Sequence, residues 1–388
     1  MNAIDACKDW LRRGYKAIVA ILPQWVMTRV IVLGTLALAN IIISRLHPPE
    51  AGVVARVHEG LLGWDAGWYE TIARFGYVRL GTGSLRFFPL LPLATRLLAQ
   101  VPALGYGTAL LLLSNGFSLV GTALLFVLAR RESGDVELAR RAVWLFCLLP
   151  PAFTYVMGYS ESMLLVCTLG CFLALRRSGD RHPAWYIAAV FGLLAALTRP
   201  LGVLLIVPIG LEAFRWRFGR FRGSNSGSLV AIGTALLAPV AGIGMFLLWA
   251  QIAVGNALTP ITVQTQAGHH GGISDPIHTL LSDAGSVFHG HYGTALHVPW
   301  VILAIILLAV CWRTWPSSYA GFATAVVLVA LSGTNLDSFE RYALSAFPLV
   351  LVGAALTKRP MTERIVLVLA ASGLIVYSLL AFLNLSVP

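Results

Sequence analysis

Charged side chains are scarce in this chain. Asp, Glu, Lys and Arg together make up 12% of its 388 residues, whereas 57% are hydrophobic. The mean hydropathy is +0.78. A soluble domain of this length needs more charge to cover its surface. The apolar residues also form runs long enough to cross a hydrocarbon core, which takes about 20 residues. These observations exclude an ordinary soluble domain and indicate a polytopic membrane protein.

Other features are missing as well. The chain has five cysteines, and none falls in a segment that we expect to lie outside the cell, so we expect no structural disulfide. Residues 1–16 are polar and charged and lack the short apolar core and small-residue cleavage site of a signal peptide. Insertion is therefore expected to start from the first true span.

Hydropathy predicts an all-α fold with about eleven transmembrane helices. We expect their cores at residues 26–45, 105–129, 142–157, 162–175, 184–198, 200–214, 229–252, 298–311, 320–335, 342–357 and 364–384.

The basic residues give an orientation. A net charge of +11 could suggest a nucleic-acid-binding surface, but the Lys and Arg residues sit in short clusters between apolar runs. A cytoplasmic N-terminus places nineteen of the 28 basic residues on the cytoplasmic side. Two long segments, residues 47–104 and 253–297, then lie outside. We expect a single transmembrane domain over 1–388 with its function in these loops.

The first long loop contains a predicted interfacial helix. Apolar residues recur at positions 64, 68, 72 and 75, which is helical spacing, and tryptophan is typical of the headgroup region. Asp65 stands at the start of this helix. Its carboxylate could cap the helix or serve in catalysis; spacing alone favours the cap, and the two roles are compatible.

Five segments, in order along the chain, resemble the PIG-V family, the GPI mannosyltransferase 2 proteins and their bacterial relatives. They are residues 64–77 (WDAGWYETIARFGY), 87–93 (FFPLLPL), 158–162 (GYSES), 195–203 (AALTRPLGV) and 340–349 (ERYALSAFPL). The resemblance implies a GT-C fold, whose interfacial first loop carries the acidic catalytic residue. It also implies a polyprenyl-phosphate mannose donor and an inverting transfer without a metal ion or other cofactor.

The residues agree with this chemistry. An acceptor hydroxyl is a weak nucleophile, and Asp65 could take its proton as general base. The departing polyprenyl phosphate needs positive charge, which arginine supplies through its fork of donors. Arg199 and Arg341, at span ends on the predicted outer face, could bind that phosphate. Alternatively, both could extend to lipid headgroups.

Several other residues are candidates for substrate binding. The second loop matches the family poorly and leaves the acceptor open: a glycolipid or another extracytoplasmic molecule. A histidine metal site there has no known ligand spacing, and acceptor binding or loop solvation is favoured. The candidates are Trp64, Trp68, Arg86, Glu161, His269 and His270.

Two rival functions remain. A lipid or glycolipid transporter would also be polytopic, but such proteins usually carry charges at the membrane midplane and repeated halves. Here the charges gather at span ends and we find no tandem repeat, which favours an enzyme. A non-catalytic scaffold in a glycolipid assembly complex is the third interpretation, and the intact Trp64-Asp65 motif argues against it only modestly.

Overall fold

The computed structural model describes residues 3–46, 60–176, 182–218, 226–264, 275, 297–333, 336 and 338–385. Within these ranges the chain forms α-helices and short 3₁₀-helices and no strand, which confirms the predicted all-α class. The elements are α1 (Ala3–Leu46), α2 (Asp65–Phe75), η2 (Thr82–Arg86), α3 (Leu90–Leu98), α4 (Tyr106–Ser133), α5 (Val136–Leu148), η3 (Pro150–Tyr155), α6 (Glu161–Leu175), α7 (His182–Thr198), η4 (Pro200–Leu205), α8 (Ile206–Phe218), α9 (Ser226–Val254), α10 (Thr259–Thr262), α13 (Val298–Thr314), α14 (Ser317–Leu331), α15 (Phe339–Ser345), α16 (Phe347–Leu356) and α17 (Pro360–Phe382).

The apolar runs are helical, and fewer than eleven of the described helices are long enough to be spans by themselves. Four described helices are long and apolar enough to cross a membrane singly: the segments Gly14–Arg45, Tyr106–Ser133, Gly227–Val254 and Pro360–Phe382. A fifth span arises if α15 and α16, which meet at 82°, form one broken crossing. Four further apolar helices have 10–17 residues. Several spans are therefore confirmed, whereas the count of eleven is not.

Small residues let the long helices approach closely. A Cβ at Gly192 of α7 would lie 2.9 Å from Cγ of Pro239 in α9. One at Gly242 of α9 would lie 2.7 Å from the carbonyl oxygen of Leu193 in α7. In a membrane, helices are not driven together by the hydrophobic effect, because lipid tails are as apolar as the side chains. They pack instead through close van der Waals contact, which glycine permits.

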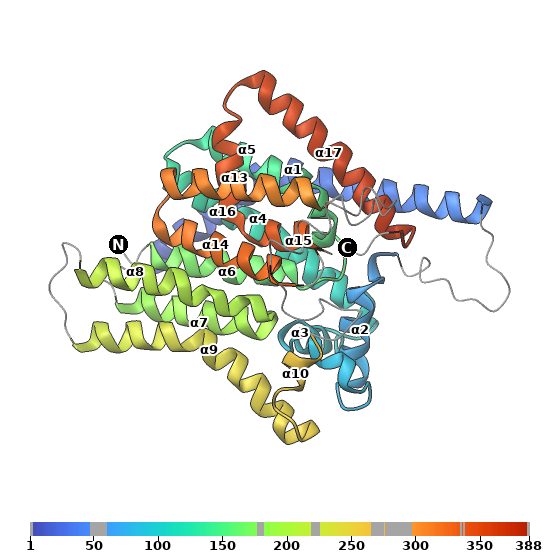
Figure 1. Ribbon diagram of the computed structural model, residues 1–388, viewed down its shortest axis with the longest axis horizontal. Helices are drawn as coiled ribbons and strands as arrows, with labels where there is room; N and C mark the ends of the chain where they lie inside the picture. Colours follow the sequence, from blue (N-terminus) through green and yellow to red (C-terminus); the bar gives the residue numbers. More distant parts are fainter. Residues whose placement is uncertain are drawn as a thin grey trace.

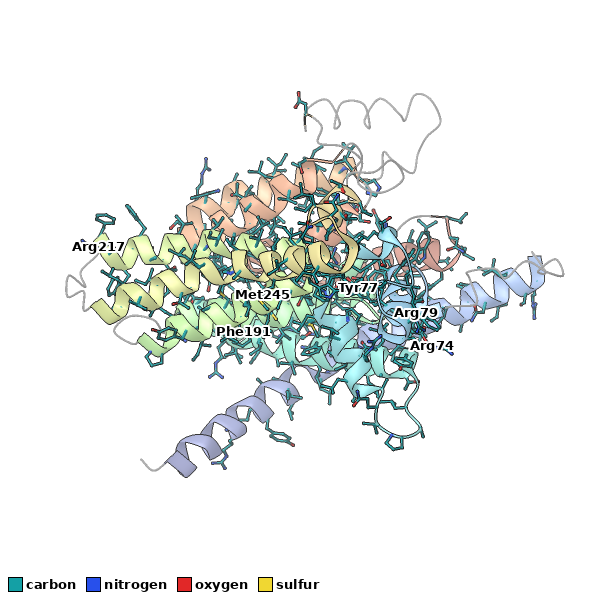
Figure 2. The ribbon with its side chains drawn as sticks, turned by 90° about the horizontal axis from the view of Figure 1, so that it is seen from below. Arg74, Tyr77, Arg79, Phe191, Arg217 and Met245 are labelled. Carbon is teal, nitrogen blue, oxygen red and sulfur yellow. The ribbon has the colours of Figure 1, made fainter. Side chains whose placement is uncertain are left out.

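The helices run roughly side by side, and the bundle has two ends. Figure 1 shows α2, α3, α10 and α15 gathered at one end, and the start of α9 with the end of α8 at the other. In the view of Figure 2, Arg217 lies toward the second end, whereas Arg74 and Arg79 lie toward the first. The first long loop thus belongs to the end at which α15 also lies.

The first long loop is folded, as predicted, from residue 60 onward. It forms α2, η2 and α3 before α4 begins. The face of α2 that packs into the protein differs from the predicted stripe: Ala66, Tyr69 and Ala73 are buried together with Ile72. Trp68 and Phe75 are exposed instead. The small alanines permit close packing, and Trp68 and Phe75 are left on the outer surface, where an interfacial helix meets lipid.

The second long loop is described only in part. It contains α10, and Gln264 Nε2 donates a 3.0 Å hydrogen bond to the carbonyl oxygen of Arg86 in η2. The two loops therefore touch. His269 and His270 lie outside the described residues.

Candidate active site

Asp65 is the first residue of α2, and its side chain points to arginines rather than to the helix backbone. Trp64 occupies the N-cap position with a φ of 57°, and no side chain caps this helix end. Oδ2 of Asp65 accepts a 2.7 Å hydrogen bond from Nη2 of Arg341. Oδ1 lies 3.7 Å from Nη2 of Arg86. The interpretation of Asp65 as a helix cap is therefore wrong.

Arg341 joins Asp65 to a second carboxylate. Its Nε lies 2.5 Å from Oε1 of Glu161, the first residue of α6. Nη1 of Arg199 pairs with the same Glu161 oxygen. Glu161, a candidate for substrate binding, thus pairs with two arginines. Five charged residues from the first loop, α6, the start of η4 and α15 thus form one cluster.

The cluster is buried. The exposed side-chain fractions are 1% for Glu161, 11% for Arg199 and 10% for Arg341. Those of Asp65 and Arg86 are 22% and 23%. Arginines that extend to lipid headgroups keep their guanidinium groups in water, so that interpretation is wrong for Arg199 and Arg341. Asp65 and Arg86 form the more open side of the cluster.

The arginines keep Asp65 ionised. Burial by itself disfavours the charged carboxylate and would raise the pKa of Asp65. The Coulombic attraction of Arg341 and Arg86, the hydrogen bond from Arg341 and the charge of Arg199 together outweigh burial and lower the pKa below the ordinary value of 3.8. Asp65 is therefore a carboxylate at neutral pH, available as a proton acceptor but weakened as a base while both arginines remain beside it.

Proline and glycine set the position of Arg199. Arg199 has an extended backbone between the end of α7 and Pro200, the first residue of η4. A Cβ at Gly202 would lie 2.1 Å from the carbonyl carbon of Ala195, so only glycine lets η4 fold back onto α7. This sharp return leaves the Arg199 side chain directed at Glu161.

Aromatic rings surround the cluster. Trp68 stacks on Phe87 with a centroid separation of 5.6 Å, and the guanidinium carbon of Arg86 lies 4.7 Å from the Phe87 centroid. The guanidinium carbon of Arg341 lies 5.0 Å from the centroid of Tyr159. Arginine is attracted to such ring faces. The indole nitrogen of Trp64 donates a 3.0 Å hydrogen bond to the carbonyl oxygen of Ala381 in α17.

A second polar group next to the cluster was not recognised from the sequence. Nδ1 of His297 lies 2.8 and 2.9 Å from the two carboxylate oxygens of Glu340, the residue before Arg341. The hydroxyl of Tyr377 donates a 3.2 Å hydrogen bond to Oε1 of Glu340. Glu340 opens the segment 340–349 that resembles the PIG-V family, and its place beside Arg341 was the available signal. Tyr377 lies within an apolar run and gave none.

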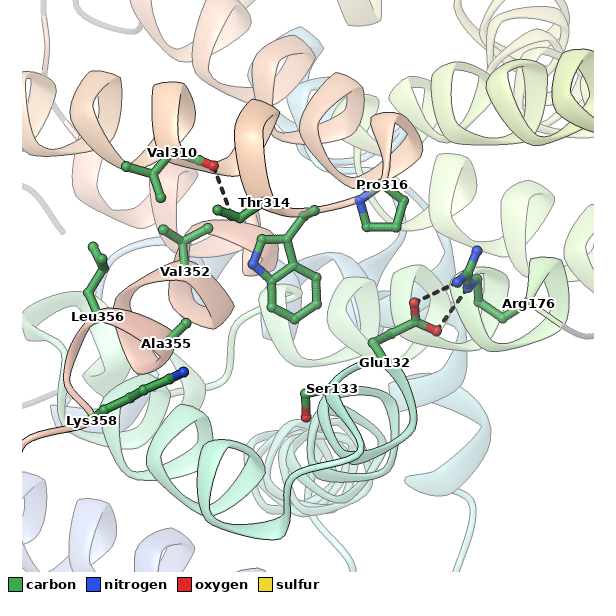
Figure 3. A pocket seen from close by; sticks show the side chains of 11 residues that line it. Glu132, Ser133, Arg176, Val310, Thr314, Pro316, Val352, Ala355, Leu356 and Lys358 are labelled. Atoms are coloured by element: carbon green, nitrogen blue, oxygen red, sulfur yellow. Dashed lines mark hydrogen bonds and ion pairs between the residues drawn. The ribbon is translucent and has the colours of Figure 1, made fainter.

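A cavity of about 490 Å³ lies elsewhere, between the ends of α4, α6, α13 and α16. Figure 3 shows Glu132 and Arg176 joined at one side of it and Lys358 at another. The Nε–Oε1 and Nη2–Oε2 distances of the Glu132–Arg176 pair are both 2.8 Å. No residue of the Asp65 cluster lines this cavity.

Comparisons with known proteins agree with the resemblance found in the sequence. The family model described as Mannosyltransferase (PIG-V) matches residues 21–207. This segment contains Asp65, Arg86, Glu161 and Arg199 but not Arg341. The resemblance to this family is confirmed, and it supports a glycosyltransferase. No curated protein matches the chain in sequence.

Among solved structures, the chain is similar to an oligosaccharyltransferase of Archaeoglobus fulgidus, in a complex with zinc and sulfate and in the apo form. The identities are 11% and 14%, and the TM-score is 0.45 in both cases. The similarity covers 92% of this chain and 53% and 56% of the two others, so the chain spans about half their length.

Proposed function

We propose that this chain transfers a sugar, mannose by family resemblance, from a polyprenyl phosphate to a hydroxyl of an extracytoplasmic acceptor. The transfer inverts the anomeric centre, and the fold is of the GT-C type. The observation that carries the proposal is the ionised carboxylate of Asp65, held beside arginines at the more open side of a buried cluster. The acceptor is a glycolipid or another extracytoplasmic molecule.

Asp65 acts as general base. As the acceptor oxygen attacks the anomeric carbon, the hydroxyl proton passes to the Asp65 carboxylate, and the bond to the phosphate oxygen breaks. The polyprenyl phosphate leaves as a stable anion, so no general acid is needed. Glycoside hydrolysis, whose leaving group must be protonated, requires a second carboxyl group. One carboxylate therefore suffices for this reaction.

The charges of the cluster fit a phosphate monoanion. Three guanidinium groups face two carboxylates, which leaves one positive charge among these five residues. A phosphodiester that links a sugar to a polyprenol carries one negative charge. Arg199 and Arg341 bind this phosphate, and Arg86 assists from the more open side, because guanidinium forks suit phosphate oxygens.

Donor binding also changes Asp65. Phosphate oxygens compete with Asp65 for Arg341 and Arg86, and each arginine that turns to the phosphate stops lowering the Asp65 pKa. The basicity of Asp65 then rises when the donor is in place. The ion pairs of the unliganded protein thus keep the basicity of Asp65 low until a sugar phosphate binds.

The remaining candidates contact the substrates. Oε2 of Glu161 is buried without a hydrogen-bond partner among the described residues, and it suits a sugar hydroxyl. Trp68, beside Arg86, offers an exposed ring to the sugar or the lipid chain. The indole N–H of Trp64 is bonded to Ala381, so this residue contributes its ring face. His269 and His270 of the second loop contact the acceptor.

The protein lies in a membrane, by its long apolar helices and its family. We place it in a bacterial plasma membrane with its N-terminus in the cytoplasm and the Asp65 cluster outside. The basic residues of the short connections favour this orientation. A polyprenyl-linked donor would then present its sugar to the cluster at the outer headgroup level.

Reconstitution tests the proposal. Purified protein in lipid vesicles is given labelled polyprenyl-phosphate mannose together with extracted bacterial lipids. The proposal predicts a labelled product that depends on the protein, while a labelled nucleotide-diphosphate sugar gives none. Transfer from the nucleotide sugar alone would contradict the donor assignment. Movement of the labelled donor across the bilayer without transfer would favour a transporter.

A further inference from the structure

The residues that precede Asp65 and Arg341 are both bonded to the last helix. Nε1 of Trp64 donates to the carbonyl oxygen of Ala381 at 3.0 Å, and the hydroxyl of Tyr377 donates to Oε1 of Glu340 at 3.2 Å. Residues 377 and 381 are four apart in α17, so they lie on one helix face in consecutive turns. One face of α17 is therefore bonded both to the residue before Asp65 and to the residue before Arg341.

Glu340 is held from α13 as well. His297, at the N-cap of α13, places Nδ1 2.8 and 2.9 Å from the two carboxylate oxygens. Trp300, one turn on, donates a 2.8 Å hydrogen bond from Nε1 to the hydroxyl oxygen of Tyr377. Glu340 and His297 are 5% and 7% exposed. A buried carboxylate with this many partners has one fixed orientation.

The helix that carries Arg341 needs such support. α15 has seven residues, and a helix this short is not stable by itself. It begins after Ser338, whose φ is 65°, and it ends at the 82° bend into α16. Glu340 and Arg341 are successive residues of α15 that bind different partners: Arg341 binds Asp65 and Glu161, and Glu340 binds His297 and Tyr377. The contacts of Glu340 therefore fix the direction of Arg341.

We propose that Glu340 and Tyr377 are positioning residues for the Asp65–Arg341 pair. Tyr377 and His297 hold Glu340, Glu340 holds α15, and α15 aims Arg341 at Asp65. The bond from Trp64 to Ala381 fixes Asp65 against the same helix. This inference rests on the proposed function of Asp65 and Arg341. It assigns a part in the reaction to α17, which lies beyond the segment that matches the mannosyltransferase family.

The first test removes one hydroxyl. Tyr377→Phe deletes only the group that bonds Glu340 and accepts from Trp300. Its matched control is Ser378→Ala on the same helix, because the buried Ser378 hydroxyl donates to the carbonyl oxygen of Leu374 within α17. We expect Tyr377→Phe to lower kcat/KM for labelled polyprenyl-phosphate mannose about ten-fold. Ser378→Ala should stay within about two-fold of the unaltered protein, and both should remain folded in detergent.

The pH profile separates positioning from a general loss of structure. The charged groups that face Asp65 are Arg341 from α15 and Arg86 from η2, and Arg199 adds a weaker Coulombic attraction. Glu161 pairs with Arg341 and Arg199. Of these, Tyr377→Phe and Glu340→Gln loosen only Arg341. The acid limb of kcat/KM should therefore move to higher pH in both variants, whereas in Ser378→Ala it should not move. A smaller folded fraction would lower activity equally at every pH.

The outcomes can be told apart. If the unaltered protein transfers no sugar from the polyprenyl donor, the proposed function itself fails. If it does, and Tyr377→Phe matches Ser378→Ala in both rate and pH profile, the positioning inference is overturned while the function stands. Should Glu340→Gln not fold, Tyr377→Phe alone decides between these results.

Discussion

Nη2 of Arg341 lies 2.7 Å from Oδ2 of Asp65, although 276 residues separate the two in sequence. The same guanidinium reaches Glu161 through Nε at 2.5 Å. Arg341 thus joins the first long loop, α6 and the C-terminal part of the fold. It also lowers the pKa of Asp65 against the effect of burial, so one contact sets both the place and the strength of the proposed base.

The first prediction concerns Arg341 as a phosphate ligand. Arg341→Lys keeps the positive charge but loses the fork that serves Asp65, Glu161 and phosphate together. We expect kcat/KM for the donor to fall about 10- to 100-fold, the effect of losing a hydrogen bond to a charged group. Arg79→Lys, at an exposed position of the first loop, is the control and should leave the rate unchanged. A normal rate for Arg341→Lys in folded protein would mean that Arg341 is no phosphate fork.

The second prediction concerns pH. The active form of Asp65 is the carboxylate, which is present above its lowered pKa and is lost as the pH falls through it. The pH profile of kcat/KM, which reports the free enzyme, should therefore show no acid limb above about pH 4 in the unaltered protein. Arg86→Gln removes one of the two nearest cations, while the burial of Asp65, which raises its pKa, is unchanged. The pKa of Asp65 therefore rises, and the acid limb moves to higher pH.

Arg79→Gln is the matched control for that experiment. It removes the same charge from the same loop, and Arg79 has no ion pair among the described residues. Its pH profile should coincide with that of the unaltered protein. An identical shift in both variants would point to the net charge of the loop rather than to contact between Arg86 and Asp65.

Much of this arrangement could be anticipated from single residues. Acidic residues are few, so Asp65 and Glu161 were conspicuous, and arginines at the ends of apolar runs were candidate phosphate ligands. The pairing of Asp65 with Arg341 could not be read from the sequence, because no local pattern reports a contact between residues so far apart. The spacing had suggested Asp65 as the N-cap of α2, but the N-cap is Trp64, which has a positive φ.

For the helices, too, one part could be predicted from the sequence and another could not. Apolar runs locate helices well, but hydropathy does not report where a helix breaks. The chain reverses direction at Arg199-Pro200 and bends by 82° before α16. Both breaks depend on packing, such as the contact of Gly202 with Ala195. The role of Tyr377 could not be recognised from the sequence, because a tyrosine in an apolar run resembles any other core residue.

The third prediction concerns orientation. With Cys7→Ser as background, Thr82→Cys places an exposed thiol in the first loop, and Ser133→Cys places one at the end of α4. The other four cysteines are buried. An impermeant thiol reagent added outside cells should label Thr82→Cys and not Ser133→Cys. The reverse pattern would place the Asp65 cluster in the cytoplasm and exclude the proposed topology.

The general base is the central claim, and Asp65→Asn tests it most directly. Asparagine keeps the size of the side chain and can still accept a hydrogen bond from Arg341, but it has no basicity. Glu70→Gln, which removes a partly buried carboxylate from the same helix outside the cluster, is the control.

The measurement is the rate of sugar transfer from labelled polyprenyl-phosphate mannose per mole of folded protein, with folding followed on the same preparation. We predict that Asp65→Asn folds normally and transfers about two to four orders of magnitude more slowly, the range for loss of a general base. Glu70→Gln should retain most of its activity. A well-folded Asp65→Asn protein that transfers sugar at a near-normal rate would contradict the assignment of Asp65 as the base.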